Sequence, residues 1–121
     1  VVLPLHPRTR AAAERFGVDF GPIRLIGPVD YRVFAGLLAG SSLVLTDSGG
    51  VQKEAYFHRV PCITLRDETE WPETVEAGWN RLWTTFDWKQ PRRDISDYGI
   101  GDAAQLIVDS IVGYIGAQRR S

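Results

Sequence analysis

Short apolar runs alternate along the chain with stretches in which apolar residues recur every three or four positions. Continuous apolar runs are typical of strands covered on both faces, and the longer period is typical of helices with one apolar face. Glycine or proline lies between most of these segments. The pattern predicts strands at residues 1–5, 24–26, 43–45, 62–65 and 81–84, and helices at 9–16, 31–38, 50–57, from 72 to a stop at Gly78, and after Asp102.

This alternation predicts the fold class. Strands that alternate with helices form a parallel sheet with helices on both sides, so we expect an α/β fold with a Rossmann-like three-layer parallel sheet. Pro4 removes a ladder donor from the first strand and favours an edge or terminal position. In the last helix Asp102 and Gln105 form a capping-box pattern. Its apolar residues line one face: Ala104, Ile107, Val108, Ile111 and Ile115.

Composition narrows the class of protein. The chain has 121 residues, 44% of them hydrophobic, which predicts one domain with one core over residues 1–121. A formal net charge of −1 without a basic block argues against nucleic acid as a partner. The apolar runs are too short to span a bilayer and the N-terminus lacks a signal-peptide layout, which predicts a cytoplasmic protein without a membrane partner.

The cysteine, metal-ligand and methionine content gives three further expectations. Cys62 is the only cysteine and lies in an apolar run, so we interpret it as a small core residue. No metal-ligand spacing occurs, and no metal is predicted. The chain contains no methionine, even at its start, and we therefore expect it to be a piece of a longer protein whose partner domain is missing.

Polar residues follow four of the predicted strands. In open parallel α/β sheets, ligands bind outside the carboxyl ends of the strands, near the topological switch point. We therefore expect these residues to converge on one rim of the sheet. They are His6-Pro7-Arg8, Gly27-Pro28, Asp47-Ser48-Gly49-Gly50 and Arg66-Asp67-Glu68.

The turn Ser48-Gly49-Gly50 is the most informative of these segments. Two glycines let backbone N–H groups approach an anion, and the helix that follows adds partial positive charge, so phosphate is the expected guest. Glu54 lies on the same helix face as Gly50, and its carboxylate can accept hydrogen bonds from sugar hydroxyls. Phosphate and ribose together indicate a nucleotide. The alternative is a helix capped by Ser48 with a tight turn and a solvated Glu54, and the pattern leaves both open.

Other candidates also have two interpretations. His6 is either a hydrogen-bonded loop residue or a catalytic group. The charged segment that holds Arg66 and Glu70 is either solvated or part of a binding site. Phe34 is most simply a core residue, and stacking on a base is the alternative.

Five stretches carry a combination of motifs: His6-Pro7-Arg8-Thr9, residues 28–34, residues 46–54, residues 65–78 and Tyr98-Gly99-Ile100-Gly101-Asp102. Together they resemble the non-hydrolysing UDP-N-acetylglucosamine 2-epimerases. The similarity covers nearly the whole chain but only the C-terminal half of such an enzyme. The run from Asp47 to Glu54 together with the Arg-Asp-x-Thr-Glu run at residues 66–70 is its most specific part.

The resemblance implies a GT-B-like fold of two Rossmann-like domains, with this chain as the UDP-binding half. The family inverts C2 of a UDP-N-acetylhexosamine: a base removes the C2 proton, UDP leaves, and both are added back with the proton on the other face. It works on a UDP-sugar substrate without a further cofactor and implies a role in cell-surface polysaccharide biosynthesis. The acid and base groups of the family lie mainly before this region, so no catalytic residue is assigned and the piece is expected to be inactive alone.

The resemblance also implies roles for individual residues. It implies that Ser48, Gly49 and Gly50 bind the diphosphate and that Glu54 binds the ribose. Phe34 and the backbone near Val29 would bind the uracil. A further group lies toward the sugar or phosphate side: His6, Arg66, Glu70 and Trp71.

Trp71 departs from the common family pattern. Many members have arginine after the Arg-Asp-x-Thr-Glu run, whereas indole has one donor and no charge. Tryptophan here looks like a subgroup that includes epimerases of modified sugars such as UDP-diacetamido-glucuronic acid. The identity of the UDP-sugar is therefore left open.

Two alternatives to an epimerase half share the same motifs. One is half of a GT-B glycosyltransferase, and acceptor-dependent transfer in place of C2 proton exchange would distinguish it. The other is a non-catalytic nucleotide-sugar-binding domain. Whether the chain forms a homodimer is also left open.

Overall fold

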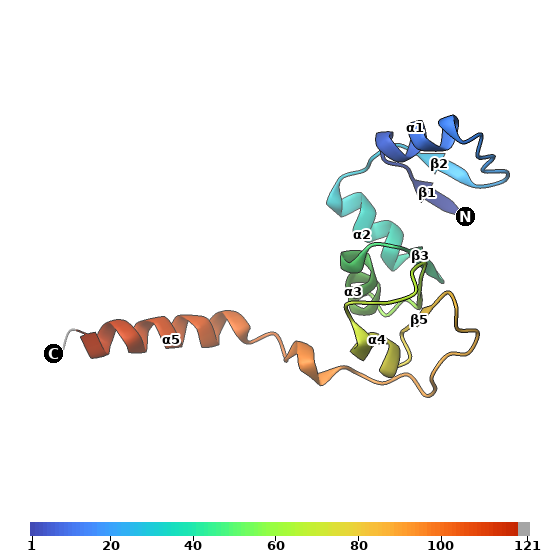
Figure 1. Ribbon diagram of the computed structural model, residues 1–121. Helices are drawn as coiled ribbons and strands as arrows, with labels where there is room; N and C mark the ends of the chain where they lie inside the picture. Colours follow the sequence, from blue (N-terminus) through green and yellow to red (C-terminus); the bar gives the residue numbers. More distant parts are fainter. Residues whose placement is uncertain (119–121) are drawn as a thin grey trace.

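The computed structural model describes residues 1–118, in which short strands and helices alternate along the chain (Figure 1). Most predicted elements are confirmed, with boundaries shifted by one or two residues. The elements are β1 (Val2–Pro4), α1 (Pro7–Arg15), β2 (Arg24–Ile26), α2 (Tyr31–Ala39), β3 (Val44–Thr46), α3 (Gly49–Phe57), β4 (Cys62–Thr64), α4 (Pro72–Glu76), β5 (Asn80–Leu82), the 3-10 turn η1 (Ser96–Tyr98) and α5 (Ala103–Gln118).

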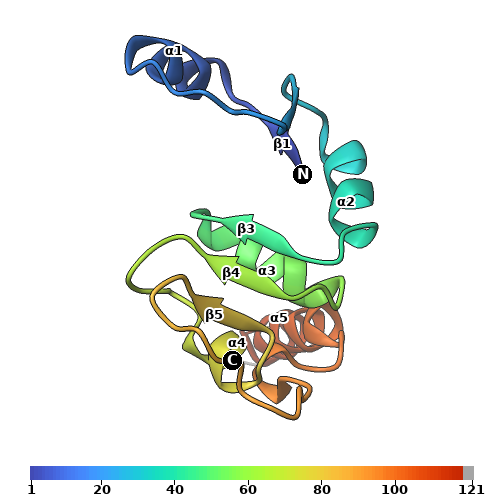
Figure 2. The ribbon, with the colours of Figure 1, turned by 90° about the vertical axis from the view of Figure 1, so that its right-hand side faces the viewer.

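The strands are parallel and fall into two sheets. β1 pairs with β2, with Leu3 opposite Leu25. β3, β4 and β5 form the second sheet in that order, with Val44 opposite Cys62 and Cys62 opposite Asn80. Figure 2 shows β1 apart from β3, with α2 connecting the two units. The predicted parallel α/β class is present, but the described strands do not form one continuous sheet.

Local chemistry explains where the helices begin and end. Asp30 is the N-cap of α2, and its Oδ1 accepts a hydrogen bond of 3.0 Å from the Val33 N–H. Proline stands in the first turn of α1 and of α4, where its missing N–H costs nothing. The predicted stop after α4 is present: Gly78 has a φ of +78°. A Cβ on Gly78 would lie 2.2 Å from the Lys89 carbonyl oxygen, so only glycine fits.

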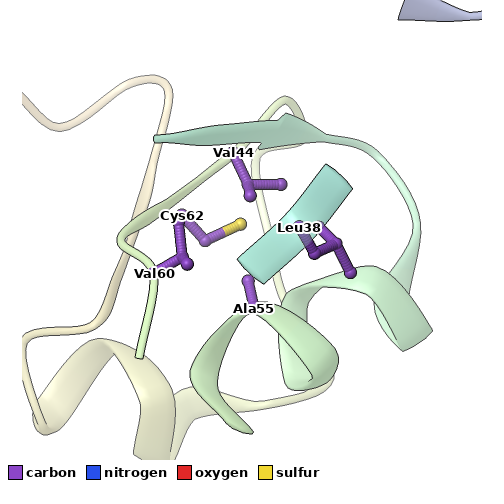
Figure 3. Packing of buried hydrophobic residues seen from close by; sticks show 5 residues of the cluster. All are labelled: Leu38, Val44, Ala55, Val60 and Cys62. Carbon is purple, nitrogen blue, oxygen red and sulfur yellow. The ribbon is translucent and has the colours of Figure 1, made fainter. Parts of the chain in front are cut away.

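The larger apolar cluster lies between α2, α3 and the second sheet (Figure 3). It consists of Leu38, Val44, Ala55, Val60 and Cys62. The Cys62 side chain is 1% exposed, and burial raises the pKa of its thiol to about 12. The interpretation of Cys62 as a small core residue is confirmed.

A second cluster holds the irregular segment between β5 and α5 in place. Tyr56, Ala77 and Ile95 are buried together, with Trp79 and Tyr98 packed against them. The Ile95 N–H donates to the Tyr56 hydroxyl over 2.8 Å. The absence of periodicity over residues 85–99 therefore corresponds to a tethered loop with one 3-10 turn.

α5 extends away from both sheets (Figure 1). The apolar face predicted for it is exposed: Ile107, Val108, Ile111 and Ile115 are 46% to 59% exposed. Gln105 donates its side-chain amide to Asp109. Within residues 1–118, no helix combines the length and the apolar character needed to cross a membrane.

Candidate functional site

The turn between β3 and α3 presents free donor positions at a helix N-terminus. Ser48 occupies the N-cap position with extended backbone, φ −83° and ψ 124°, but its side chain makes no capping hydrogen bond. Its own N–H donates to Thr46 Oγ1 over 3.0 Å. The first intrahelical bond of α3 runs from the Gln52 N–H to the Ser48 carbonyl, so the N–H groups of residues 49–51 precede the helical ladder. Such groups, aligned with the helix dipole, favour an anion.

The two glycines of this turn have different surroundings. A Cβ on Gly49 would lie 3.0 Å from Glu70 Oε2 and 3.6 Å from Trp71 Nε1, because the following polar loop packs against it. A Cβ on Gly50 would meet only Ser48 Oγ, at 4.0 Å. Gly49 therefore allows the glycine turn and the polar loop to pack closely. Gly50 leaves open space beside the N–H donor groups.

Glu54 lies one turn further along α3, on the face that carries Gly50. The residue is half-buried, and its Oε2 is buried without a hydrogen-bond partner among the described residues. A buried carboxylate oxygen without a donor is costly, which favours a ligand that brings one. Side chains on a helix tilt toward its N-terminus, so we expect this carboxylate to reach toward the glycine turn.

The polar loop after β4 is held by an ion pair. Arg66 lies 2.7 Å from Glu70 and 3.9 Å from Glu68, measured between guanidinium nitrogens and carboxylate oxygens. The hydrogen bond from Arg66 lowers the pKa of the Glu70 carboxyl, and the carboxylate raises the pKa of Arg66. Their side chains remain 33% and 50% exposed, so both groups are accessible from solvent.

Trp71 joins the polar loop to the glycine turn. Its indole N–H donates to the Gly49 carbonyl oxygen over 2.8 Å. The Lys53 ammonium lies 4.0 Å from the centre of the Trp71 ring, within range of a cation–π interaction. The only polar donor of this indole is therefore engaged inside the protein.

A buried polar network supports the site from below. Asn80 Nδ2 donates to Gln52 Oε1 and to Thr74 Oγ1, over 3.2 Å in each case. Thr64 Oγ1 donates to Asn80 Oδ1 over 3.0 Å, and Thr69 donates to Gln52 Oε1. Gln52, Thr64, Thr74 and Asn80 are 0% to 1% exposed.

This network links β4, β5, α3, α4 and the polar loop, and sequence reasoning missed it. The sequence carries no local signal for it, because Gln52 stands between Val51 and Lys53 and Asn80 between Trp79 and Arg81. A single chain does not indicate which polar residue meets which, because the partners are up to 28 positions apart.

The remaining predicted site residues lie elsewhere. His6 is exposed at the start of α1, where its Nδ1 accepts from the Arg8 N–H over 3.2 Å, as in the loop interpretation. Phe34 is half-buried and packs against the larger apolar cluster, and Val29 is half-buried just before α2. The structure brings Gly49 together with Glu70 and Trp71. His6 follows a strand of the other sheet.

Comparison with known proteins gives a consistent picture. A profile of the family described as UDP-N-acetylglucosamine 2-epimerase matches residues 1–112. The UDP-2,3-diacetamido-2,3-dideoxy-D-glucuronate 2-epimerase of Pseudomonas aeruginosa is 57% identical over 82 residues, which are 68% of this chain and 23% of that protein. The UDP-N-acetylglucosamine 2-epimerase of Bacillus subtilis is 34% identical in an alignment 137 positions long, gaps included, which covers 98% of this chain and 36% of that protein.

A solved structure agrees with these matches. The UDP-GlcNAc 2-epimerase of Methanocaldococcus jannaschii, in complex with UDP-GlcNAc and UDP, superimposes with a TM-score of 0.71 at 37% identity. The match covers 93% of this chain and 35% of that one. The predicted α/β fold class is confirmed. The chain spans only between 23% and 36% of the length of these relatives.

Proposed function

The chain belongs to the UDP-N-acetylglucosamine 2-epimerase family, and we propose that it is the UDP-binding half of such an enzyme. The reaction is inversion at C2 of a UDP-N-acetylhexosamine through elimination and re-addition of UDP. The catalytic acid and base belong to the rest of the enzyme, so this piece is inactive alone. The chain's matching only part of each relative supports this division.

One observation carries the proposal: the N-terminus of α3 combines an open anion site with a carboxylate that lacks a donor. The N–H groups of residues 49–51 precede the helical ladder and the Ser48 side chain makes no capping bond, which supports our assignment of the diphosphate to this turn. Glu54 Oε2 is buried and unpaired among the described residues, as expected for a group that accepts hydrogen bonds from ribose hydroxyls. Nucleoside diphosphates supply both kinds of group in one molecule.

The residues for the uracil and sugar parts of the ligand are assigned from their positions around the glycine turn. Phe34 lies in the first half of α2, which packs against α3, and Val29 lies just before this helix; we assign both to the base. Arg66 and Glu70 remain partly exposed beside the turn and are assigned to the phosphate or sugar side with His6. Trp71 contributes by donating its indole N–H to the Gly49 carbonyl, and this donor is therefore not offered to the ligand.

One comparison favours a different UDP-sugar as the substrate. The 57% identical relative is named for UDP-2,3-diacetamido-2,3-dideoxy-D-glucuronate, and Trp71 stands where many family members have arginine. If this chain shares that specificity, the completed enzyme will epimerise the diacetamido sugar faster than UDP-N-acetylglucosamine. Measuring both reactions with the chain joined to the other half of an epimerase decides between the two substrates.

The test of the UDP site is an NMR titration of the chain with UDP and with uridine. We expect shifts at Ser48 to Gly50, Glu54 and Phe34 with UDP, and weaker binding of uridine because it lacks the diphosphate. Gly50→Ala should weaken UDP binding about tenfold without loss of stability, since its Cβ would enter the ligand's space and not the protein's. Glu54→Gln should weaken it by a similar factor.

Matched controls separate these effects from general damage. Gly113→Ala changes a glycine of α5 that also has open space around it, and Glu14→Gln neutralises an exposed carboxylate on α1. Both variants should bind UDP like the parent chain. A folded chain that gives no shifts with UDP, or a Gly50→Ala variant that binds as well as the parent, would falsify the proposed site.

A further inference from the structure

Two pairs of residues on neighbouring faces of α3 meet different parts of the site. Gly50 and Glu54 are four positions apart and share the face assigned to the ligand. Gly49 and Lys53 are also four positions apart, on the face that the polar loop covers at Trp71. Because helical side chains tilt toward the N-terminus, Lys53 is expected to reach toward Gly49.

Lys53 contacts two aromatic rings from different segments. Its ammonium nitrogen lies 4.0 Å from the centre of the Trp71 ring and 4.4 Å from the centre of the Tyr98 ring. Both distances are inside the range of about 6 Å in which a ring face attracts a cation. The residue is half-buried, and within residues 1–118 it forms no ion pair with a carboxylate. The two rings are therefore the groups with which this charge interacts.

The Tyr98 ring is fixed to the rest of the chain. Its hydroxyl donates to Glu73 Oε1 over 2.8 Å, and its ring packs against Tyr56 with the ring centres 5.3 Å apart. Burial and the Glu73 carboxylate raise the pKa of the Tyr98 hydroxyl, so this group stays protonated and remains a donor. Tyr98 thus gives Lys53 a fixed point of attachment.

Trp71 has less support of its own. It directly precedes the five-residue helix α4, and its half-buried side chain makes one hydrogen bond, to the Gly49 carbonyl oxygen. A cation that attracts a fixed ring and a less fixed ring at the same time limits how far the second ring can move. Lys53 therefore restricts the Trp71 indole to the position in which its N–H meets Gly49.

The Gly49 carbonyl matters for the anion site because of peptide geometry. The carbonyl of Gly49 and the N–H of Gly50 belong to one planar peptide group and point in opposite directions. An indole that holds the carbonyl oxygen therefore also fixes the direction of the Gly50 N–H, one of the donors assigned to the diphosphate.

We propose that Lys53 is a positioning residue of the UDP site. Its ammonium, attached to Tyr98, holds the Trp71 indole on the Gly49 carbonyl and so orients the donors of the glycine turn. The effect on UDP rests on the function proposed above, whereas the hold on Trp71 does not. The alternative is that Lys53 acts on the ligand through its charge alone, independently of Trp71.

The first measurement uses the chain without UDP. Hydrogen exchange of the Trp71 indole N–H is followed by NMR, and its signal is assigned by its absence in Trp71→Phe. Lys53→Met keeps a long side chain but removes the charge, and it should speed this exchange about tenfold. Lys53→Arg keeps a cation for both rings and should stay within about twofold of the parent chain.

Matched variants separate this effect from a general change of charge. Lys89→Met makes the same change at an exposed lysine and should leave the exchange of the Trp71 indole unaltered. The indole of Trp83, which donates to Asp67, is an internal reference in the same spectra. Tyr98→Leu removes the anchoring ring but keeps the charge of Lys53, and it should speed the exchange of the Trp71 indole as Lys53→Met does.

The second measurement is a double-mutant cycle on UDP affinity. Lys53→Met alone should weaken UDP binding about fivefold, as expected for Trp71→Phe. In a chain that already carries Trp71→Phe, Lys53→Met should cause no further loss, because the indole N–H that Lys53 holds is absent. Uridine affinity should be the same in all four chains, since uridine lacks the diphosphate.

The outcomes are distinct. Unchanged exchange of the Trp71 indole in a folded Lys53→Met variant would overturn the proposal. Additive losses in the cycle would also overturn it, since Lys53 would then act independently of Trp71. If the parent chain binds no UDP, the site proposed above fails, and the indole exchange by itself supports or overturns the hold of Lys53 on Trp71.

Discussion

The β1–α1–β2 unit and the β3–β5 unit have similar strands in sequence but differ in burial. In the first unit only Leu5 and Ala13 are buried. In the second, all of β4 is buried: Cys62 belongs to the larger apolar cluster and Thr64 to the polar network. β4 has a neighbour on each side, whereas β1 has one. The comparison shows that an apolar strand is buried in a core only when paired strands and helices pack around it.

The same contrast applies to function. The glycine turn, Glu54 and the polar loop all belong to the better packed unit, and its network fixes the polar loop against the turn. His6 belongs to the unit with little burial of its own. The four tryptophans lie between residues 71 and 88, so tryptophan fluorescence reports on the second unit alone. This allows the two units to be tested separately.

The largest effect is expected from Asn80→Ala. The substitution removes partners from Gln52, Thr74 and Thr64 in a dry interior and should lower the free energy of unfolding by about 3 kcal/mol. Urea unfolding followed by tryptophan fluorescence measures it. Gln105→Ala, which removes an exposed amide of α5, should change stability by less than about 0.5 kcal/mol. Equal effects of the two variants would mean that the network does not stabilise the second unit.

A smaller effect is expected from pH, through Cys62. Burial raises the thiol pKa to about 12 in the folded chain, against an ordinary value of 9.0. The folded chain therefore keeps a proton that the unfolded chain loses, so stability is full below pH 9.0 and falls as pH rises toward 12. The slope from this thiol approaches about 1.4 kcal/mol per pH unit. Urea unfolding at several alkaline pH values should show a shallower decline for Cys62→Ala.

Trp71→Phe tests whether the packing of the glycine turn supports UDP binding. Phenylalanine keeps a ring near Lys53 but loses the N–H bond to the Gly49 carbonyl, worth about 1 kcal/mol. UDP affinity should fall about fivefold as the glycine turn loosens. Trp83→Phe loses a comparable bond, to Asp67, away from the turn, and should leave UDP affinity unchanged. The two variants are compared by the same titration, and a normal affinity for Trp71→Phe contradicts the holding role.

The smallest effect is expected in the first unit. Leu25→Ala alters a half-buried residue of β2 and should shift the tryptophan-detected unfolding by less than about 0.5 kcal/mol. A cost of about 2 kcal/mol would mean that the two units unfold as one.

Much of the local structure could be predicted from the sequence. The strand at residues 24–26 agrees with its prediction. α4 begins at Pro72, because proline presets the φ of the first helical turn, and it stops before Gly78, which adopts a positive φ open to glycine. Other boundaries differ by a residue or two, as for β3, which begins at Val44. The α5 face that begins at Ile107 has the periodicity of a buried helix but lies exposed, since periodicity shows what a helix can cover and not what is there to be covered.

The sequence by itself determined the elements, the parallel α/β class and the glycine turn with Glu54, because turns, caps and helical faces depend on residues at most four positions apart. Only the tertiary structure decided that the strands divide into two sheets. It also decided that Trp71 holds Gly49 and that Asn80 joins Gln52. These contacts join residues 22 and 28 positions apart. Their formation depends on which strands and helices are present as neighbours, which no local pattern specifies.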